Sequence, residues 1–97
     1  MLAEIIAIGD ELTSGQRLDT NSQWLSHELG LLGIPVGYHT TACDTLAAGV
    51  DAFRVAAGRA QVVVATGGLG PTADDLTRDV LSQLSGQRLV LSEQALE

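Results

Sequence analysis

Aromatic side chains are scarce in this chain: they make up 3% of its 97 residues, whereas hydrophobic residues make up 45%. The core must therefore be built from aliphatic side chains, and the hydrophobic content argues against a disordered chain. The single cysteine, Cys43, excludes an internal disulfide framework, and with only two histidines the sequence has no recognisable zinc pattern. We expect Cys43 to be a small buried residue and the protein to be cytoplasmic.

Basic residues are also few, with five against twelve acidic residues and a formal net charge of −7. They form no cluster along the chain, which argues against nucleic acid as a direct partner. No apolar run approaches the ~18 residues that a membrane span needs. Residues 1–4 lack the positive charge of a signal peptide. The sequence therefore predicts neither a nucleic-acid partner nor a membrane partner.

The length of the chain fits one small domain with one core. Its last segment, Ser92–Glu97, has the pattern of a capped helix start that breaks off soon after it begins. We therefore expect the sequence to be the first part of a longer domain.

Apolar segments with strand character alternate with segments of helical spacing. Strands are expected over 4–8, 34–41 and 62–65. The alternation recurs at about thirty residues, the length of a βαβ unit. It predicts an α/β fold, a three-layer sandwich in which helices flank a mainly parallel sheet. The partial alternation of 34–41 favours a position nearer the sheet edge.

The two helices between these strands have identifiable starts and apolar faces. Asp19 or Thr20 can cap the first helix, and Asp44 is a candidate cap for the second. In the first helix, the apolar residues expected on one face are Trp24, Leu25, Leu29 and Leu32. In the second, they are Leu46, Val50, Phe53 and Ala57.

A glycine-rich stretch, Thr66–Asp79, follows the apolar run at 62–65 and leads into a third segment with helical spacing. Its glycines and the helix start could hold a phosphate. Asp74 and Asp75 would repel a bare phosphate, and a bridging divalent cation such as Mg²⁺ would resolve the conflict. Two alternatives remain: a purely structural turn, and a dinucleotide fingerprint, which the position at the third βα turn disfavours.

The loops at Gly9, Asp44 and Gly67 are expected to emerge together, because the carboxyl ends of parallel strands meet at one edge of a sheet. These loops carry five acidic residues, which are Asp10, Glu11, Asp44, Asp74 and Asp75. This set favours a metal-chelated phosphate or a ligand that presents hydrogen-bond donors. Solvated turns and helix caps are the alternative roles for the same residues. His27 and His39 fall outside these loops.

Three ordered motifs identify a family. They are 8–15 (IGDELTSG), 19–22 (DTNS) and 66–78 (TGGLGPTADDLTR). Together they closely resemble the N-terminal domain of the competence/damage-inducible CinA family, over nearly all of the chain. The resemblance implies a fold like that of the molybdopterin-binding domains. It also implies metal-dependent ADP-ribose pyrophosphatase activity in this domain of the parent protein. A C-terminal domain that deamidates nicotinamide mononucleotide, and the later segments of the first domain, are missing from this sequence.

The family resemblance also implies a set of site residues. The ligand-binding residues would be Gly9, Asp10, Glu11, Ser14, Gly15, Thr66, Gly67, Gly68, Gly70 and Thr77. The catalytic residues would be Asp75 and Asp44, and Asp74, Asp75 and Asp44 would hold the divalent metal ion.

Three hypotheses for function follow. In the first, the intact parent hydrolyses a nucleotide diphosphate, with the metal polarising phosphorus and activating water. In the second, the domain is a non-catalytic module that binds a pterin or a nucleotide. In the third, the chain is an inactive fragment whose sheet edge pairs with another copy. A homo-oligomer, with a dimer favoured, is the expected assembly.

Overall fold

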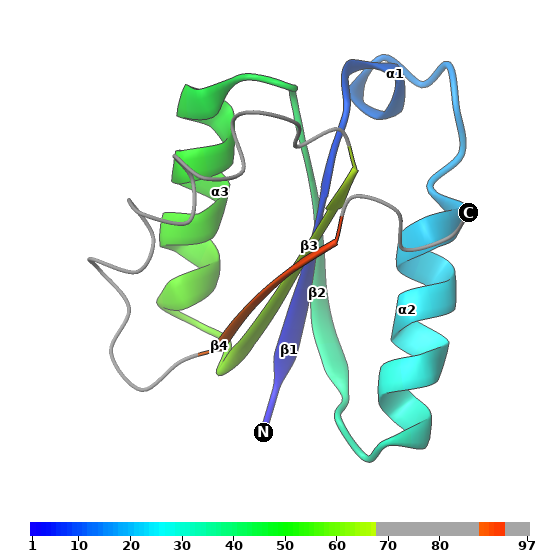
Figure 1. The fold of residues 1–97 in the computed structure, drawn as a ribbon, viewed down its shortest axis with the longest axis vertical. Helices are drawn as coiled ribbons and strands as arrows, with labels where there is room; N and C mark the ends of the chain where they lie inside the picture. Colours follow the sequence, from blue (N-terminus) through cyan, green and yellow to red (C-terminus); the bar gives the residue numbers. More distant parts are fainter. Residues whose placement is uncertain (68–87, 93–97) are drawn as a thin grey trace.

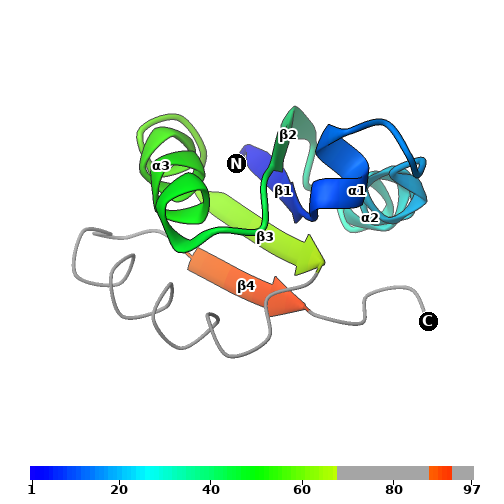
Figure 2. The same cartoon turned by 90° about the horizontal axis from the view of Figure 1, so that it is seen from above.

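The computed structural model describes residues 1–67 and the strand at residues 88–92 (Figure 1). In chain order its elements are β1 (Ala3–Ile8), α1 (Asp10–Thr13), α2 (Thr20–Leu31), β2 (Val36–Ala42), α3 (Leu46–Ala57), β3 (Val62–Gly67) and β4 (Arg88–Ser92). The four strands pair in parallel in the order β2-β1-β3-β4. Figures 1 and 2 show α3 on one face of this sheet and α2 on the other. The predicted three-layer α/β fold is confirmed.

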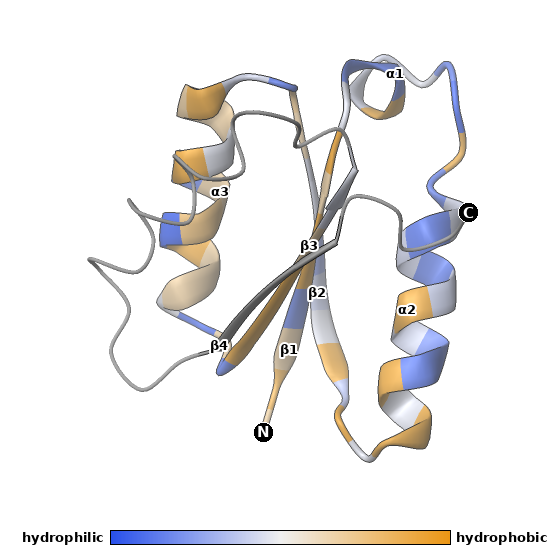
Figure 3. Ribbon diagram, viewed as in Figure 1, coloured by the Kyte–Doolittle hydropathy of each residue, from blue (hydrophilic) through white to orange (hydrophobic). Residues whose placement is uncertain are grey.

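Strand β1 is one of the two inner strands of the sheet, and all six of its residues are buried. This follows from its two covered faces: Ile6 and Ile8 pack with Phe53 of α3, whereas Ile5 packs with Leu25 of α2. Figure 3 shows hydrophobic residues dominating the central strands. A continuous apolar run, without alternation, is what a strand buried on both faces requires.

Helix α2 begins after Asp19, whose side chain accepts a hydrogen bond from the Ser22 N–H, so Asp19 is the cap of the two that the sequence offered. Its predicted apolar face is partly wrong. Leu25 and Leu29 pack on the sheet, but Trp24 is 47% exposed and Leu32 is 75% exposed. With 3.6 residues per turn, neighbouring residues point about 100° apart, so Trp24 cannot share the direction of Leu25.

The N-cap of helix α3 lies one residue later than the sequence predicted. Thr45, not Asp44, is the N-cap, and its hydroxyl accepts a hydrogen bond from the Ala48 N–H at 3.2 Å. The helix buries Phe53 against the sheet, as expected. Cys43, which precedes the cap, is exposed, so its predicted burial is wrong. It lies beyond the end of β2, where the chain has left the covered part of the sheet.

Strand β2 lies at an edge of the sheet, as predicted. Its pairing with β1 is interrupted once: Val36 pairs with Ala3 and Tyr38 with Glu4, so Gly37 is left as a bulge. A bulge in an edge strand increases local twist and disfavours pairing with another chain. Within the described ranges, no helix has the length and apolar character needed to cross a membrane.

Candidate functional site

The carboxyl ends of the three strands β1, β2 and β3 coincide at one edge of the sheet. Ile8 of β1 pairs with Ala42 of β2 and with Gly67 of β3. The loops that follow these strands therefore leave the sheet side by side, as the sequence predicted. This edge is also the end at which ligands bind in open parallel sheets.

Two hydrogen bonds connect the first two of these loops. The Gly9 N–H donates to the carbonyl oxygen of Ala42 at 3.0 Å, and the Asp44 N–H donates to Asp10 Oδ1 at 2.9 Å. Asp10 begins the short helix α1, which the sequence did not predict. Asp10 and Asp44 are thus neighbours at the sheet edge, although both side chains are exposed.

Gly67 ends β3 in a conformation that favours glycine, with φ at +114°. A Cβ atom at this position would collide with the carbonyl oxygen of Ile8 on the adjacent strand. The residue is therefore required by the close approach of two backbones. The first glycine of the glycine-rich stretch therefore lies directly against β1.

A pocket of about 250 Å³ opens at this edge, beside the start of α2. Its described lining residues are Ala7, Ile8, Glu11, Leu12, Arg17, Leu18, Asp19, Thr20, Asn21, Thr66 and Gly67. Ala7 and Thr66 are paired neighbours on β1 and β3 and form its floor. The pocket thus lies between the sheet, α1 and the amino end of α2.

Thr66 carries the clearest sign of a ligand in this pocket. The residue is 1% exposed, yet its hydroxyl oxygen has no hydrogen-bond partner. Leaving a buried hydroxyl unpaired costs about 1–3 kcal/mol. It is the single such side-chain atom in the part of the chain that the structure describes. A polar group of a ligand in the pocket would satisfy it.

Charged side chains line the entrance of the pocket. Asp19 is engaged by α2, because it accepts hydrogen bonds from the Ser22 N–H at 3.0 Å and from the Ser22 hydroxyl at 2.6 Å. The Glu11 carboxylate lies close to Gly9, since a Cβ built on Gly9 would lie 2.6 Å from Glu11 Oε1. Arg17 contributes the positive charge of the lining.

The pocket brings together three of the predicted site residues: Glu11, Thr66 and Gly67. The other predicted residues that the structure describes lie near the same edge without lining the pocket, and they are Gly9, Asp10, Ser14, Gly15 and Asp44. The remaining predicted residues, Gly68, Gly70, Asp74, Asp75 and Thr77, lie outside the described residues. Within 1–67, no three His, Cys, Asp or Glu side chains are placed to hold a metal ion together.

Sequence reasoning missed the pocket wall formed by residues 17–21. The sequence predicts only a possible cap at Thr20, and Thr20 and Asn21 are the first two residues of α2. The signal was present in the DTNS motif, because it is one of the three motifs on which the family resemblance depends. Arg17 had no such signal.

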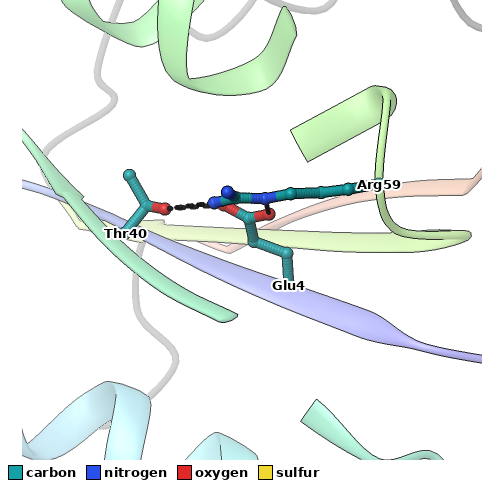
Figure 4. Close-up of polar contacts among 3 residues, drawn as sticks. All are labelled: Glu4, Thr40 and Arg59. Carbon is teal, nitrogen blue, oxygen red and sulfur yellow. Dashed lines mark hydrogen bonds and ion pairs between the residues drawn. The ribbon is translucent and has the colours of Figure 1, made fainter. Parts of the chain in front are cut away.

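A buried carboxylate, that of Glu4, lies near the amino end of β1, away from the carboxyl edge, and Figure 4 shows it with Thr40 and Arg59. Glu4, which is fully buried, accepts two hydrogen bonds from the Arg59 guanidinium, at 2.7 and 2.9 Å, and one from the Thr40 hydroxyl at 2.6 Å. Arg59 also stacks 3.9 Å above the Tyr38 ring. Burial raises the pKa of Glu4, but the hydrogen bonds from Arg59 and Thr40 and the Arg59 charge together hold it below its ordinary value. Every carboxylate oxygen is satisfied, so the cluster is structural.

Comparison with known proteins shows the family of this chain. A family model described as "Probable molybdopterin binding domain" matches residues 4–97. The chain belongs to this family. A CinA-like protein of Dictyoglomus thermophilum is 47% identical over 97 residues, covering 100% of this chain and 24% of that protein.

Solved structures agree with this assignment. The crystal structure of the protein CinA with unknown function from Thermoplasma acidophilum matches with a TM-score of 0.71 and 34% identity. The match covers 84% of this chain and 48% of that one. The tungsten cofactor synthesizing protein MoaB from Pyrococcus furiosus matches with a TM-score of 0.67 and 28% identity, over 84% and 51% of the two chains. The resemblance to CinA is confirmed, and the chain spans 23–24% of the length of the curated relatives it matches.

Proposed function

We propose that the pocket at the carboxyl edge binds a nucleotide diphosphate such as ADP-ribose, and that the intact protein hydrolyses it with the help of a divalent metal ion. The observation that carries the binding step is the unpaired Thr66 hydroxyl at the floor of the pocket. A ribose or phosphate oxygen would accept its proton, or a ring N–H would donate to it. The hydrolytic step depends on the resemblance to the CinA family.

Among the described residues, Asp44 is the proposed ligand of the metal ion. Asp44 lies beside Asp10, whose Oδ1 accepts the Asp44 N–H, and both carboxylates face solvent at the edge where the phosphates would lie. Oxygen ligands of this kind suit Mg²⁺, which keeps several waters when it binds. Asp74 and Asp75 are the proposed further ligands. The bound metal would neutralise the phosphate charge and activate water.

The hydrolysis is tested in the intact protein with the variant Asp75→Asn. We expect metal-dependent ADP-ribose turnover to fall at least about tenfold, because a metal-bound carboxylate is lost while the protein stays folded. The matched control is Asp51→Asn, which removes an exposed carboxylate on α3 far from the sheet edge. Unchanged turnover in the folded Asp75→Asn protein would overturn the assignment of the metal site.

A second candidate is a non-catalytic module that binds a phosphorylated pterin. The description of the matching family favours it. Isothermal titration with ADP-ribose and with a phosphorylated pterin, each with and without Mg²⁺, separates the two candidates. Metal-independent pterin binding without any turnover would favour the module.

A further inference from the structure

The described arginines differ in how their charges are compensated. Arg59 is paired with Glu4 at 2.7 Å, and Arg54 is paired with Asp51 at 3.3 Å. Arg17 forms no ion pair with any described residue. It is exposed, and it lines the pocket at the carboxyl edge. The single uncompensated arginine within residues 1–67 therefore lies at the pocket.

The backbone holds Arg17 in this position. Its N–H donates to the carbonyl oxygen of Glu11 at 3.1 Å, which folds the segment between α1 and α2 back onto α1. Thr20 and Asn21, which follow it, form the first turn of α2 and line the same pocket. The first N–H groups of a helix lack partners inside the helix and favour an anion.

Three positive or donor groups therefore converge on one cavity. They are the Arg17 side chain, the unpaired hydroxyl of Thr66 and the amino end of the twelve-residue helix α2, where Asp19 already accepts the Ser22 N–H. Two carboxylates also line the cavity. Asp19 is engaged by two hydrogen bonds from Ser22, whereas Glu11 opposes an anion.

We propose that Arg17 is the specificity-determining residue of this pocket, and that it selects ligands carrying a phosphate or diphosphate group over their uncharged counterparts. The planar guanidinium donates to two phosphate oxygens at the entrance, while Thr66 contacts the ligand at the floor. A lysine cannot reproduce this bidentate geometry. This inference rests on the proposed binding function, because it names the ligand charge that the same pocket recognises.

The test compares the intact wild-type protein with Arg17→Gln and Arg17→Lys by isothermal titration at low and moderate salt. The probes are ADP-ribose, inorganic diphosphate and the uncharged analogue adenosine. We expect Arg17→Gln to weaken ADP-ribose and diphosphate about tenfold or more, as for loss of a charge-assisted hydrogen bond, and to leave adenosine unchanged. Arg17→Lys should recover part of the loss, and added salt should reduce the difference between the proteins.

Arg54→Gln is the matched control, because it removes an exposed arginine on α3 and is expected to change none of these affinities. Equal weakening of ADP-ribose and adenosine in Arg17→Gln would overturn the inference, as would unchanged binding of both phosphate-bearing probes. Circular dichroism establishes that the variants are folded, which is expected because the Arg17 side chain forms no ion pair within the part of the chain that the structure describes.

The outcomes separate this inference from the proposed function. If the wild type hydrolyses ADP-ribose and Arg17→Gln binds it equally well, the inference fails and the function stands. If diphosphate binds in an Arg17-dependent manner but ADP-ribose is not hydrolysed, the hydrolytic function fails and the inference stands. If the wild type binds no phosphate-bearing probe, both fail.

Discussion

The carboxylate of Asp10 accepts a hydrogen bond from the backbone N–H of Asp44 at 2.9 Å, which joins the loop after β1 to the loop after β2. The two acidic residues are therefore held as neighbours by a contact between a side chain and the backbone. Because Asp10 uses Oδ1 for this contact, its other oxygen and the Asp44 carboxylate remain for a ligand.

Replacing Asp10 tests this link. In Asp10→Ala the Asp44 amide loses its acceptor, and we expect its hydrogen exchange to accelerate about fivefold, the equivalent of about 1 kcal/mol. In Asp10→Asn the side-chain carbonyl can still accept the bond, so exchange should remain close to that of the wild type. Equal exchange rates in Asp10→Ala and Asp10→Asn would show that the contact does not order the loop.

Thr66→Val is expected to stabilise the free protein and to weaken its ligand. Valine has nearly the shape of threonine and removes the unpaired hydroxyl, so the free energy of unfolding should rise by about 1 kcal/mol. ADP-ribose affinity should fall, because the pocket loses a polar contact. Chemical denaturation without ligand and isothermal titration measure the two effects.

Thr40→Val is the matched control for this substitution, since the Thr40 hydroxyl is fully used: it donates to Glu4 at 2.6 Å. This variant should lose about 1–2 kcal/mol of stability and keep its ligand affinity. A destabilised Thr66→Val protein would mean that the Thr66 hydroxyl is satisfied in the free state.

Gly67→Ala should destabilise the fold by about 1–3 kcal/mol, because the new Cβ would collide with the Ile8 carbonyl oxygen in a left-handed conformation. Gly30→Ala provides the control. Gly30 lies within α2 with open space around it, so alanine there should raise stability by about 0.5 kcal/mol. Thermal unfolding of both variants measures the contrast, and equal melting temperatures would contradict it.

Glu4→Gln should lower the free energy of unfolding at neutral pH by about 1–3 kcal/mol, because charge-assisted hydrogen bonds from Arg59 and Thr40 are weakened. Asp51→Asn, which breaks an exposed pair, should cost less than about 0.5 kcal/mol.

The contribution of Glu4 also predicts a pH dependence. The folded state holds the pKa of Glu4 below its ordinary value of 4.5, so its contribution is fully present above pH 4.5 and is lost as the pH falls through the folded pKa. Denaturation at a series of pH values should show the difference between wild type and Glu4→Gln narrowing below pH 4.5. A difference that stays constant down to strong acid would contradict this account.

The strands were predictable from sequence because their signal is local. The apolar runs at 4–8 and 62–65 could only be buried on both faces, and this placed them at the centre of a parallel sheet. The predictions that were wrong concern side-chain direction and the position of a helix cap, which composition does not determine. Trp24 is apolar but half exposed. The N-cap of α3 is Thr45, one residue after the predicted Asp44.

The candidate site was predictable only in part, for a related reason. Gly67 was predicted because a glycine turn after a buried strand is a local pattern. The wall formed by Arg17, Thr20 and Asn21 was not, since it exists only where the segment before α2 folds back to Glu11 and faces Thr66 across the pocket. A pocket wall that forms only in the folded protein produces no periodic pattern in the sequence.

The central position of β1 has a consequence for the synthesis of the protein. β1 precedes both of its neighbours in the chain. Ala3 can therefore pair only after Val36 and Val62, its partners on the two sides, have been synthesised. At a synthesis rate of about 5–20 residues per second, this apolar strand stays unpaired for several seconds until both partner strands have been made. Pairing between distant segments is slow to begin, and an unpaired apolar strand readily associates with other chains. The nascent chain is thus most exposed to aggregation before β3 is complete, when chaperones would have most effect on yield.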